Sequence, residues 1–177
     1  PPDHQCLSRC GYRCQFGSLL MDKAAVLEKI INSLQSELET YIRAAKFSHA
    51  EATAEENRAE NKYDTRGLEA SYLAAGQANK VVELEAAISS FEELKDKPAN
   101  ESVEIGALVE LAQEGALELY FIGPTAGGTE VEVAGSEILI ITPESPLGSQ
   151  LMGLETDQKN TLDLAGRKQK VQVKSVC

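Results

Sequence analysis

Four carboxylate residues lie close together near the middle of the chain: Glu55, Glu56, Glu60 and Asp64. Glu56, Glu60 and Asp64 follow one another at steps of four, so on a helix they would share one face. Like charges at this spacing repel each other by roughly 0.2–0.5 kcal/mol per pair. A bound divalent cation would relieve that repulsion. An acidic stripe exposed to solvent is the simpler interpretation, and spacing alone favours it.

Three basic residues form a second row at the same spacing: Arg58, Lys62 and Arg66. Two residues along a helix correspond to a rotation of about 200°, so this row faces away from the acidic one. It can contact phosphate groups or a partner protein, or it can serve only as solubilising charge. His49 has no partner at a spacing typical of a ligand or a proton relay, and we interpret it as a surface residue. The chain shows neither nucleophile–histidine spacing nor a phosphate-binding glycine loop.

Composition limits the functions open to the chain. With 177 residues and a net charge of -11, it is not expected to bind nucleic acid indiscriminately, although a local basic patch or a basic partner can still bring it to RNA. No apolar run reaches the length of a membrane span. The first half is rich in Ala, Glu, Leu and Lys and the second in Gly, Val, Ile and Thr, which favours two domains.

The first 20 residues hold three of the four cysteines, Cys6, Cys10 and Cys14, and show no regular period. We interpret residues 1–20 as a non-native or disordered leader and Met21 as the natural start. The alternative is a metal or iron–sulfur site, although the spacing lacks the usual two-residue gap and an evident fourth ligand. Cys177 is expected to be a free thiol. Without the leader nothing indicates an oxidising compartment, and we expect a cytoplasmic protein.

Two long helices are expected to position the acidic and basic rows. The first runs from about Asp22 to Ala50, with apolar residues at alternating steps of four and three at Leu27, Ile31, Leu34, Leu38, Tyr41 and Ala45. The second covers at least Leu68 to Leu94. Its seam begins at Leu68, Tyr72 and Ala75 and, after a slip near Gly76, continues at Val81, Leu84, Ile88 and Phe91.

Two seams of similar length predict an antiparallel coiled-coil hairpin over residues 21–96. If Val26 lies opposite Leu94, the apex falls near Glu60 and the tip covers residues 51–66. The distance from Asp22 to Glu60 is then about 57 Å. A hairpin of this length indicates a segment that inserts into a partner molecule. The simpler alternative is a coiled-coil dimerisation arm.

Residues 97–177 are predicted to form a second domain after a linker that contains Pro98 and Asn100. Turn signals separate six expected strands, at Ala107–Leu111, Leu117–Ile122, Thr129–Val133, Ile138–Thr142, Asn160–Leu164 and Val171–Ser175. Ser149–Gly153 is expected to be a short helix. The whole chain is therefore predicted to be an α+β protein, with a helical hairpin followed by a mainly antiparallel sheet carrying one short helix.

The stretch Ser145-Pro146-Leu147-Gly148, followed by Leu151-Met152-Gly153, resembles the Gre family of bacterial transcription elongation factors. Tyr120–Pro124 and Ile105–Val109 resemble two strands of the same family, and the resemblance covers residues 21–177. At the expected tip, Glu60-Asn61 matches the family, whereas the family's aspartate falls on Asn57. Tyr72–Gln77 matches another family segment, but both matches hold only with an insertion.

This resemblance implies a coiled coil that enters the secondary channel of RNA polymerase and a C-terminal domain of the FKBP type. It implies that Glu60, with Glu56 or Asp64, acts in cleavage of the 3′ end of backtracked RNA. Glu60 and Glu56 would weakly bind a Mg²⁺ ion that the polymerase shares, and Arg58, Lys62 and Arg66 would contact nascent RNA or the polymerase. Docking on the polymerase would fall to the residues Ser145, Pro146, Leu147 and Gly148.

By the same resemblance, the protein is an activator of the polymerase and not itself an enzyme, with no small-molecule substrate and no membrane partner. Two alternatives stay open. A non-cleaving modulator or inhibitor that occupies the same channel is favoured by Asn57. A prolyl isomerase or chaperone is disfavoured because only Tyr120 and Phe121 are aromatic in the predicted C-terminal domain, residues 97–177, where an isomerase needs an aromatic-rich pocket.

Overall fold

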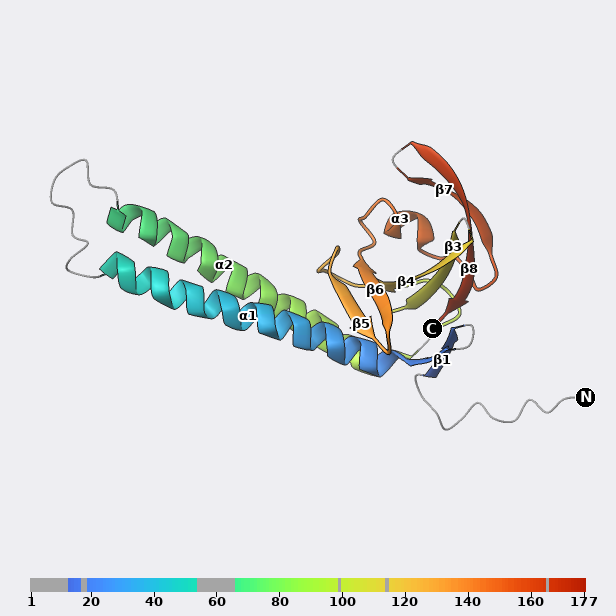
Figure 1. Cartoon of the computed structure of the whole chain (residues 1–177), viewed down its shortest axis with the longest axis horizontal. Coiled ribbons are helices and arrows are strands. Elements are labelled where there is room, and N and C mark those ends of the chain that lie inside the picture. The colour runs from blue at the N-terminus through green and yellow to red at the C-terminus, as the bar shows by residue number, and fades with distance from the viewer. Residues whose placement is uncertain (1–12, 17–18, 54–65, 99, 114, 165) are drawn as a thin grey trace, which may run out of the picture. The chain divides into compact units, whose positions relative to one another are not determined.

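The computed structural model describes residues 13–16, 19–53, 66–98, 100–113, 115–164 and 166–177. The chain divides into two compact units, one formed by Pro1–Ile30 with Ser90–Cys177 and the other by Ile31–Ser89. A helical hairpin and a six-stranded mixed sheet make this an α+β protein (Figure 1). In the described part of the chain, no helix is both long and apolar enough to span a membrane.

The hairpin consists of α1, Lys23–Thr53, and α2, Arg66–Glu92, which lie side by side and run in opposite directions (Figure 1). The expected seam of α1 is confirmed, because all of its members are buried or half-buried. Asp22 precedes the helix and caps it: its Oδ1 accepts a hydrogen bond of 3.0 Å from the Ala24 N–H. This bond satisfies one of the donors that a helix start leaves unpaired.

The seam of α2 differs from the expected one. Its buried and half-buried positions run at unbroken steps of four and three through Ala70, Ala74, Gln77, Val81, Leu84, Ile88 and Phe91. Leu68 and Tyr72 are 57% and 72% exposed, so the predicted start of the seam and the slip near Gly76 are wrong. The register of the apolar run from Val81 to Phe91 continues through the small residues, because neighbouring turns of one helix keep the same face toward their partner.

The segment before α1 also differs from expectation. Strand β1, Arg13–Phe16, pairs antiparallel with β2, Leu19–Asp22, where we expected no strand before Met21 and a helix from Asp22. Met21 is only 1% exposed and lies in the strand. Cys177 is disulfide-bonded, so the expectation of a free thiol is wrong.

The larger sheet has the order β5-β6-β4-β3-β8-β7. All six expected strands are present, with bounds β3 Leu108–Gln113, β4 Ala116–Ile122, β5 Glu130–Val133, β6 Ser136–Ile141, β7 Lys159–Leu164 and β8 Arg167–Val176. Neighbours are antiparallel except β4 and β6, which are parallel. The β5–β6 turn places both Ala134 and Gly135 at positive φ, as a tight two-residue hairpin requires.

Both faces of the sheet bury apolar side chains. On one face, Val109 and Ile122 pack with Leu151 of the short helix α3, Gly148–Leu151. On the other, Phe121 lies against Phe91 from the end of α2, with ring centroids 6.1 Å apart and both side chains fully buried. After α2, a single 3-10 turn, Glu93–Asp96, ends the helical segment and leads into the sheet.

Candidate functional site

The expected catalytic tip lies almost entirely outside the described residues. This applies to Glu55, Glu56, Arg58, Glu60, Lys62 and Asp64, while Arg66 begins α2. Within the described ranges, no group of three or more His, Cys, Asp or Glu residues is placed to hold a metal ion. The roles of Glu60, Glu56 and Asp64, and a shared Mg²⁺, therefore stay predictions.

The expected docking segment, Ser145–Gly148, is a turn organised by one hydroxyl group. Ser145 Oγ donates a hydrogen bond of 2.7 Å to the Thr142 carbonyl and accepts one of 3.0 Å from the Gly148 N–H. The Ser145 N–H also donates to the Thr142 carbonyl, at 3.0 Å. A serine at this position thus closes the turn between β6 and α3 with both its side chain and its backbone.

Gly148 and Leu147 also hold this turn in place. A Cβ built on Gly148 would lie 2.0 Å from the Thr142 carbonyl oxygen, closer than any side chain permits. Leu147 packs against the core cluster that holds Leu151, whereas Pro146 is exposed. Leu147 therefore anchors the segment to the core, and the Pro146 ring is exposed to solvent.

Gln150 braces the same turn against a distant strand. Its Nε2 donates to the Pro146 carbonyl at 2.6 Å and to the Asp163 carbonyl at 2.9 Å. Its Oε1 accepts a hydrogen bond of 2.7 Å from the Asp163 N–H. The amide side chain thereby joins the turn to β7, and the sequence provided no signal for this link, because residues 150 and 163 belong to different elements.

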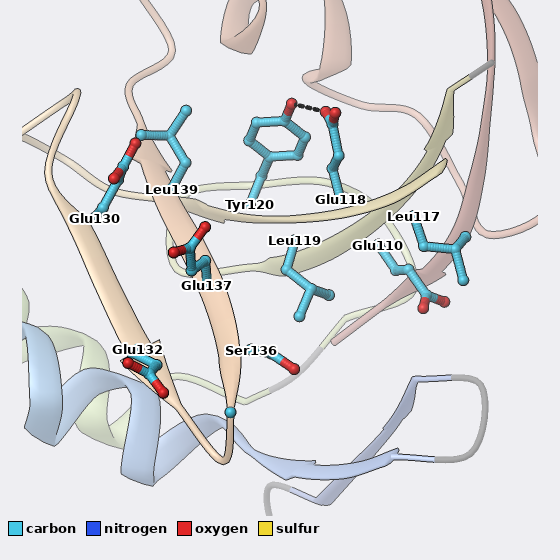
Figure 2. Close-up of a pocket in the computed structure, with 11 residues that line it drawn as sticks. Glu110, Leu117, Glu118, Leu119, Tyr120, Glu130, Glu132, Ser136, Glu137 and Leu139 are labelled. Atoms are coloured by element: carbon cyan, nitrogen blue, oxygen red, sulfur yellow. Dashed lines mark hydrogen bonds between the residues drawn. The ribbon is translucent and has the colours of Figure 1, made fainter. Parts of the chain in front are cut away.

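A cavity of about 810 Å³ lies among the first half of β4, the start of β6, and strands β3 and β5 (Figure 2). We call it the acidic notch. It is lined by Glu110, Leu117, Glu118, Leu119, Tyr120, Glu130, Glu132, Gly135, Ser136, Glu137 and Leu139. This cavity was not predicted from the sequence. The alternation Glu130-Val131-Glu132-Val133 was the available signal, because in a strand it places both carboxylates on one face.

Tyr120 and Glu118 point the same way from β4 in the acidic notch, and the phenol donates a hydrogen bond to the Glu118 carboxylate (Figure 2). Burial, and next this hydrogen bond, raises the pKa of the Tyr120 phenol above its ordinary value. Tyr120 therefore remains a proton donor at neutral pH and holds Glu118 in position.

No family profile matches the chain, and no curated protein matches it. The solved structures that resemble it include GreA factor homolog 1 (Gfh1) of Thermus thermophilus, at 21% identity over 83% of this chain and 94% of that one, with a TM-score of 0.35. Thermus aquaticus Gfh1 is 21% identical over 87% of this chain and 94% of that one, with a TM-score of 0.36.

Proposed function

We propose that this protein binds bacterial RNA polymerase through its secondary channel and stimulates cleavage of the 3′ end of backtracked RNA. The observation that carries the proposal is the Ser145–Gly148 turn, which bears the most distinctive part of the sequence resemblance. Its serine and glycine are each required by the local geometry, and Pro146 is left exposed for a partner. A helical hairpin precedes the sheet, as such a factor requires.

In this proposal, α1 and α2 present the segment between them to the polymerase. Glu60, assisted by Glu56 or Asp64, orients the attacking water, and Arg58, Lys62 and Arg66 contact RNA phosphates or the polymerase. A Mg²⁺ ion bound in the complex would supply charge stabilisation to the reacting phosphate. Carboxylates suit this ion, which keeps several waters and needs only one or two protein ligands. The polymerase performs the cleavage, and this protein activates it.

A second function is favoured by one residue. Asn57 stands where the Gre family carries an aspartate, and an amide is a neutral and weaker ligand for Mg²⁺ than a carboxylate. On this alternative the protein occupies the channel and modulates or inhibits the polymerase without stimulating cleavage. Both functions require docking on the polymerase. They differ in whether the residues at the tip of the hairpin stimulate cleavage.

The deciding experiment is RNA cleavage by stalled, backtracked bacterial RNA polymerase with Mg²⁺. The parent protein is compared with Glu60→Ala and with Glu37→Ala, a matched loss of one exposed carboxylate on α1. The cleavage function predicts shortened RNA with the parent and Glu37→Ala, and none with Glu60→Ala. Competition with a known channel-binding factor, without shortened RNA, would establish the modulator instead. Absence of both would refute polymerase binding.

Docking is tested separately through the exposed ring of Pro146. Pro146→Ala removes that ring and keeps the carbonyl that accepts the Gln150 hydrogen bond. We expect weaker competition for the polymerase, while Thr156→Ala, at an exposed position of the same unit outside this turn, leaves competition unchanged. Equal affinity of the parent and Pro146→Ala would place the docking surface elsewhere.

A further inference from the structure

The disulfide bond of Cys177 ties the end of β8 to the N-terminal segment. Cys177 is disulfide-bonded, and the other cysteines of the chain are Cys6, Cys10 and Cys14. Its partner is therefore one of these three. Pro1–Ile30 and Ser90–Cys177 form one compact unit, so the bond lies within that unit. No step of the proposed polymerase function uses it.

Cys14 belongs to the strand that reaches β8. It lies in β1, Arg13–Phe16, and β1 contacts β8, which ends at Val176 immediately before Cys177. Figure 1 shows β1 beside the C-terminus. Because the Cα atoms of a disulfide usually lie about 4.4–6.8 Å apart, the partner of Cys177 has to come from a segment next to the end of β8. β1 meets this condition.

The C-terminal side of the bond is held by the sheet. The Leu108 N–H donates a hydrogen bond of 2.8 Å to the Cys177 carbonyl, and the Cys177 N–H donates one of 3.0 Å to the Leu108 carbonyl. Leu108 is fully buried. These bonds involve only the backbone, so Cys177 keeps its place when its sulfur is reduced. Cys177 is half-buried, and disulfides that solvent reaches are the more easily reduced ones.

The N-terminal side depends more strongly on the bond. In the described part of the chain, β1 pairs only with β2, Leu19–Asp22, as a separate two-stranded sheet. A two-stranded hairpin is at best marginally stable by itself. β2 has an anchor of its own, because Met21 is 1% exposed and α1 follows directly at Lys23. We therefore expect β1 to leave its position before β2 does when the disulfide opens.

We propose that Cys14 and Cys177 form a redox-sensitive clamp, which holds β1 against β8 when oxidised and releases it when reduced. The reductant is a dithiol. One of its thiolates attacks one sulfur of the bond and forms a mixed disulfide, and the other cysteine leaves as a thiolate. The second thiolate of the reductant then displaces the attached cysteine. The reductant ends as a disulfide, and its two protons pass to the thiols of Cys14 and Cys177.

The pairing is tested by mass spectrometry of the full chain after oxidation with glutathione disulfide and blocking of free thiols. Trypsin cleaves after Arg9, Arg13 and Lys174, which separates the three N-terminal cysteines and releases the peptide that ends at Cys177. We expect this peptide to be linked to the one that begins at Cys14. Its linkage to either of the other two cysteines, or no linkage, would overturn the proposal.

The clamp itself is tested by hydrogen exchange of the oxidised chain and of the chain reduced with dithiothreitol. We expect reduction to speed exchange of the β1 amides by roughly tenfold or more, because removing a cross-link makes local opening easier. The amides of β3 and β8 should keep their rates, since the backbone hydrogen bonds between Leu108 and Cys177 remain. Equal rates for β1 in both states would mean that the bond does not hold the strand.

Cys14→Ser should exchange rapidly in β1 under both conditions, and Cys177→Ser, a second variant in case the first fails to fold, should behave in the same way. The matched control is Cys6→Ser, which removes a cysteine outside β1 and should respond to reduction as the parent does. A control that no longer responds to reduction would also contradict the clamp. Because every measurement is made without polymerase, failure of the clamp leaves the proposed function untouched.

Discussion

Gly148 approaches Thr142 so closely that any Cβ at position 148 would lie 2.0 Å from the Thr142 carbonyl oxygen. The clash is with backbone, which cannot rotate away, so Gly148→Ala must displace the turn and with it the base of α3. We expect Gly148→Ala to lower the free energy of unfolding by about 2 kcal/mol or more, within the range found for overpacked buried sites. Urea unfolding, followed by the amide NMR signals of β3 and β8, measures it.

The matched control is Gly76→Ala in α2. A Cβ there would meet no atom within 4 Å, and Ala is a better helix former than Gly. This variant should gain roughly 0.5–1 kcal/mol in the unfolding of the hairpin. If both alanine variants change stability in the same direction, the close approach at Gly148 is not what selects glycine there.

Of the phenylalanines on α1 and α2, Phe91 is expected to cause the largest loss of stability when it is replaced by alanine. It is fully buried against Phe121, so Phe91→Ala should lose about 3–5 kcal/mol through lost burial and a cavity. Phe47 is 70% exposed, and Phe47→Ala should cost less than about 0.5 kcal/mol. Thermal unfolding of the two variants, with the parent alongside, gives the comparison; similar losses would contradict the assigned burial.

Gln77 occupies a seam position of α2, and its Oε1 is buried without a hydrogen-bond partner among the described residues. Replacing it by leucine removes an unsatisfied polar atom and adds apolar contact. We expect Gln77→Leu to raise the unfolding free energy of the hairpin by roughly 1–2 kcal/mol. A lower free energy would mean that the amide makes a favourable contact in solution.

Lys23 should make stability depend on pH in the alkaline range. Its side chain is 2% exposed, and burial, followed by the Lys97 ammonium, lowers the pKa of Lys23 against the opposing effect of Glu104. Glu104 is already engaged, 3.3 Å from Lys97 Nζ and 2.7 Å from Asn100 Nδ2. The buried ammonium is therefore poorly compensated.

Between the lowered folded pKa of Lys23 and its unfolded value of 10.5, the unfolded chain binds more protons, so stability rises with pH. Lys23→Met should be more stable than the parent at pH 7, and the difference should shrink as pH rises through that window. Unfolding free energies at a series of pH values test this, with Lys95→Met as the exposed control. An unchanged difference across the series would rule out Lys23 as the titrating group.

The six strands of the larger sheet and the two long helices were predictable because alternation and heptad spacing are local properties of the chain, whereas β1 and β2 were not predicted. The seam of α2 was not, since Leu68 and Tyr72 are larger than Ala70 and Ala74, and size does not show which face meets a partner helix. The acidic notch required β3, β4, β5 and β6 to be brought together, which local spacing cannot reveal. The tip carboxylates lie outside the described residues, and their roles stay predictions.

The position of β8 between β3 and β7 has a consequence during synthesis. β8 pairs with β3 on one side and β7 on the other, and Leu108 exchanges backbone hydrogen bonds of 2.8 and 3.0 Å with Cys177. As the chain leaves the ribosome, β3 can pair with β4 early, but its second edge stays bare until β8 emerges. Such an edge invites pairing with another nascent chain. Slow translation of the last strands, or a chaperone that covers β3, would therefore decide between folding and aggregation.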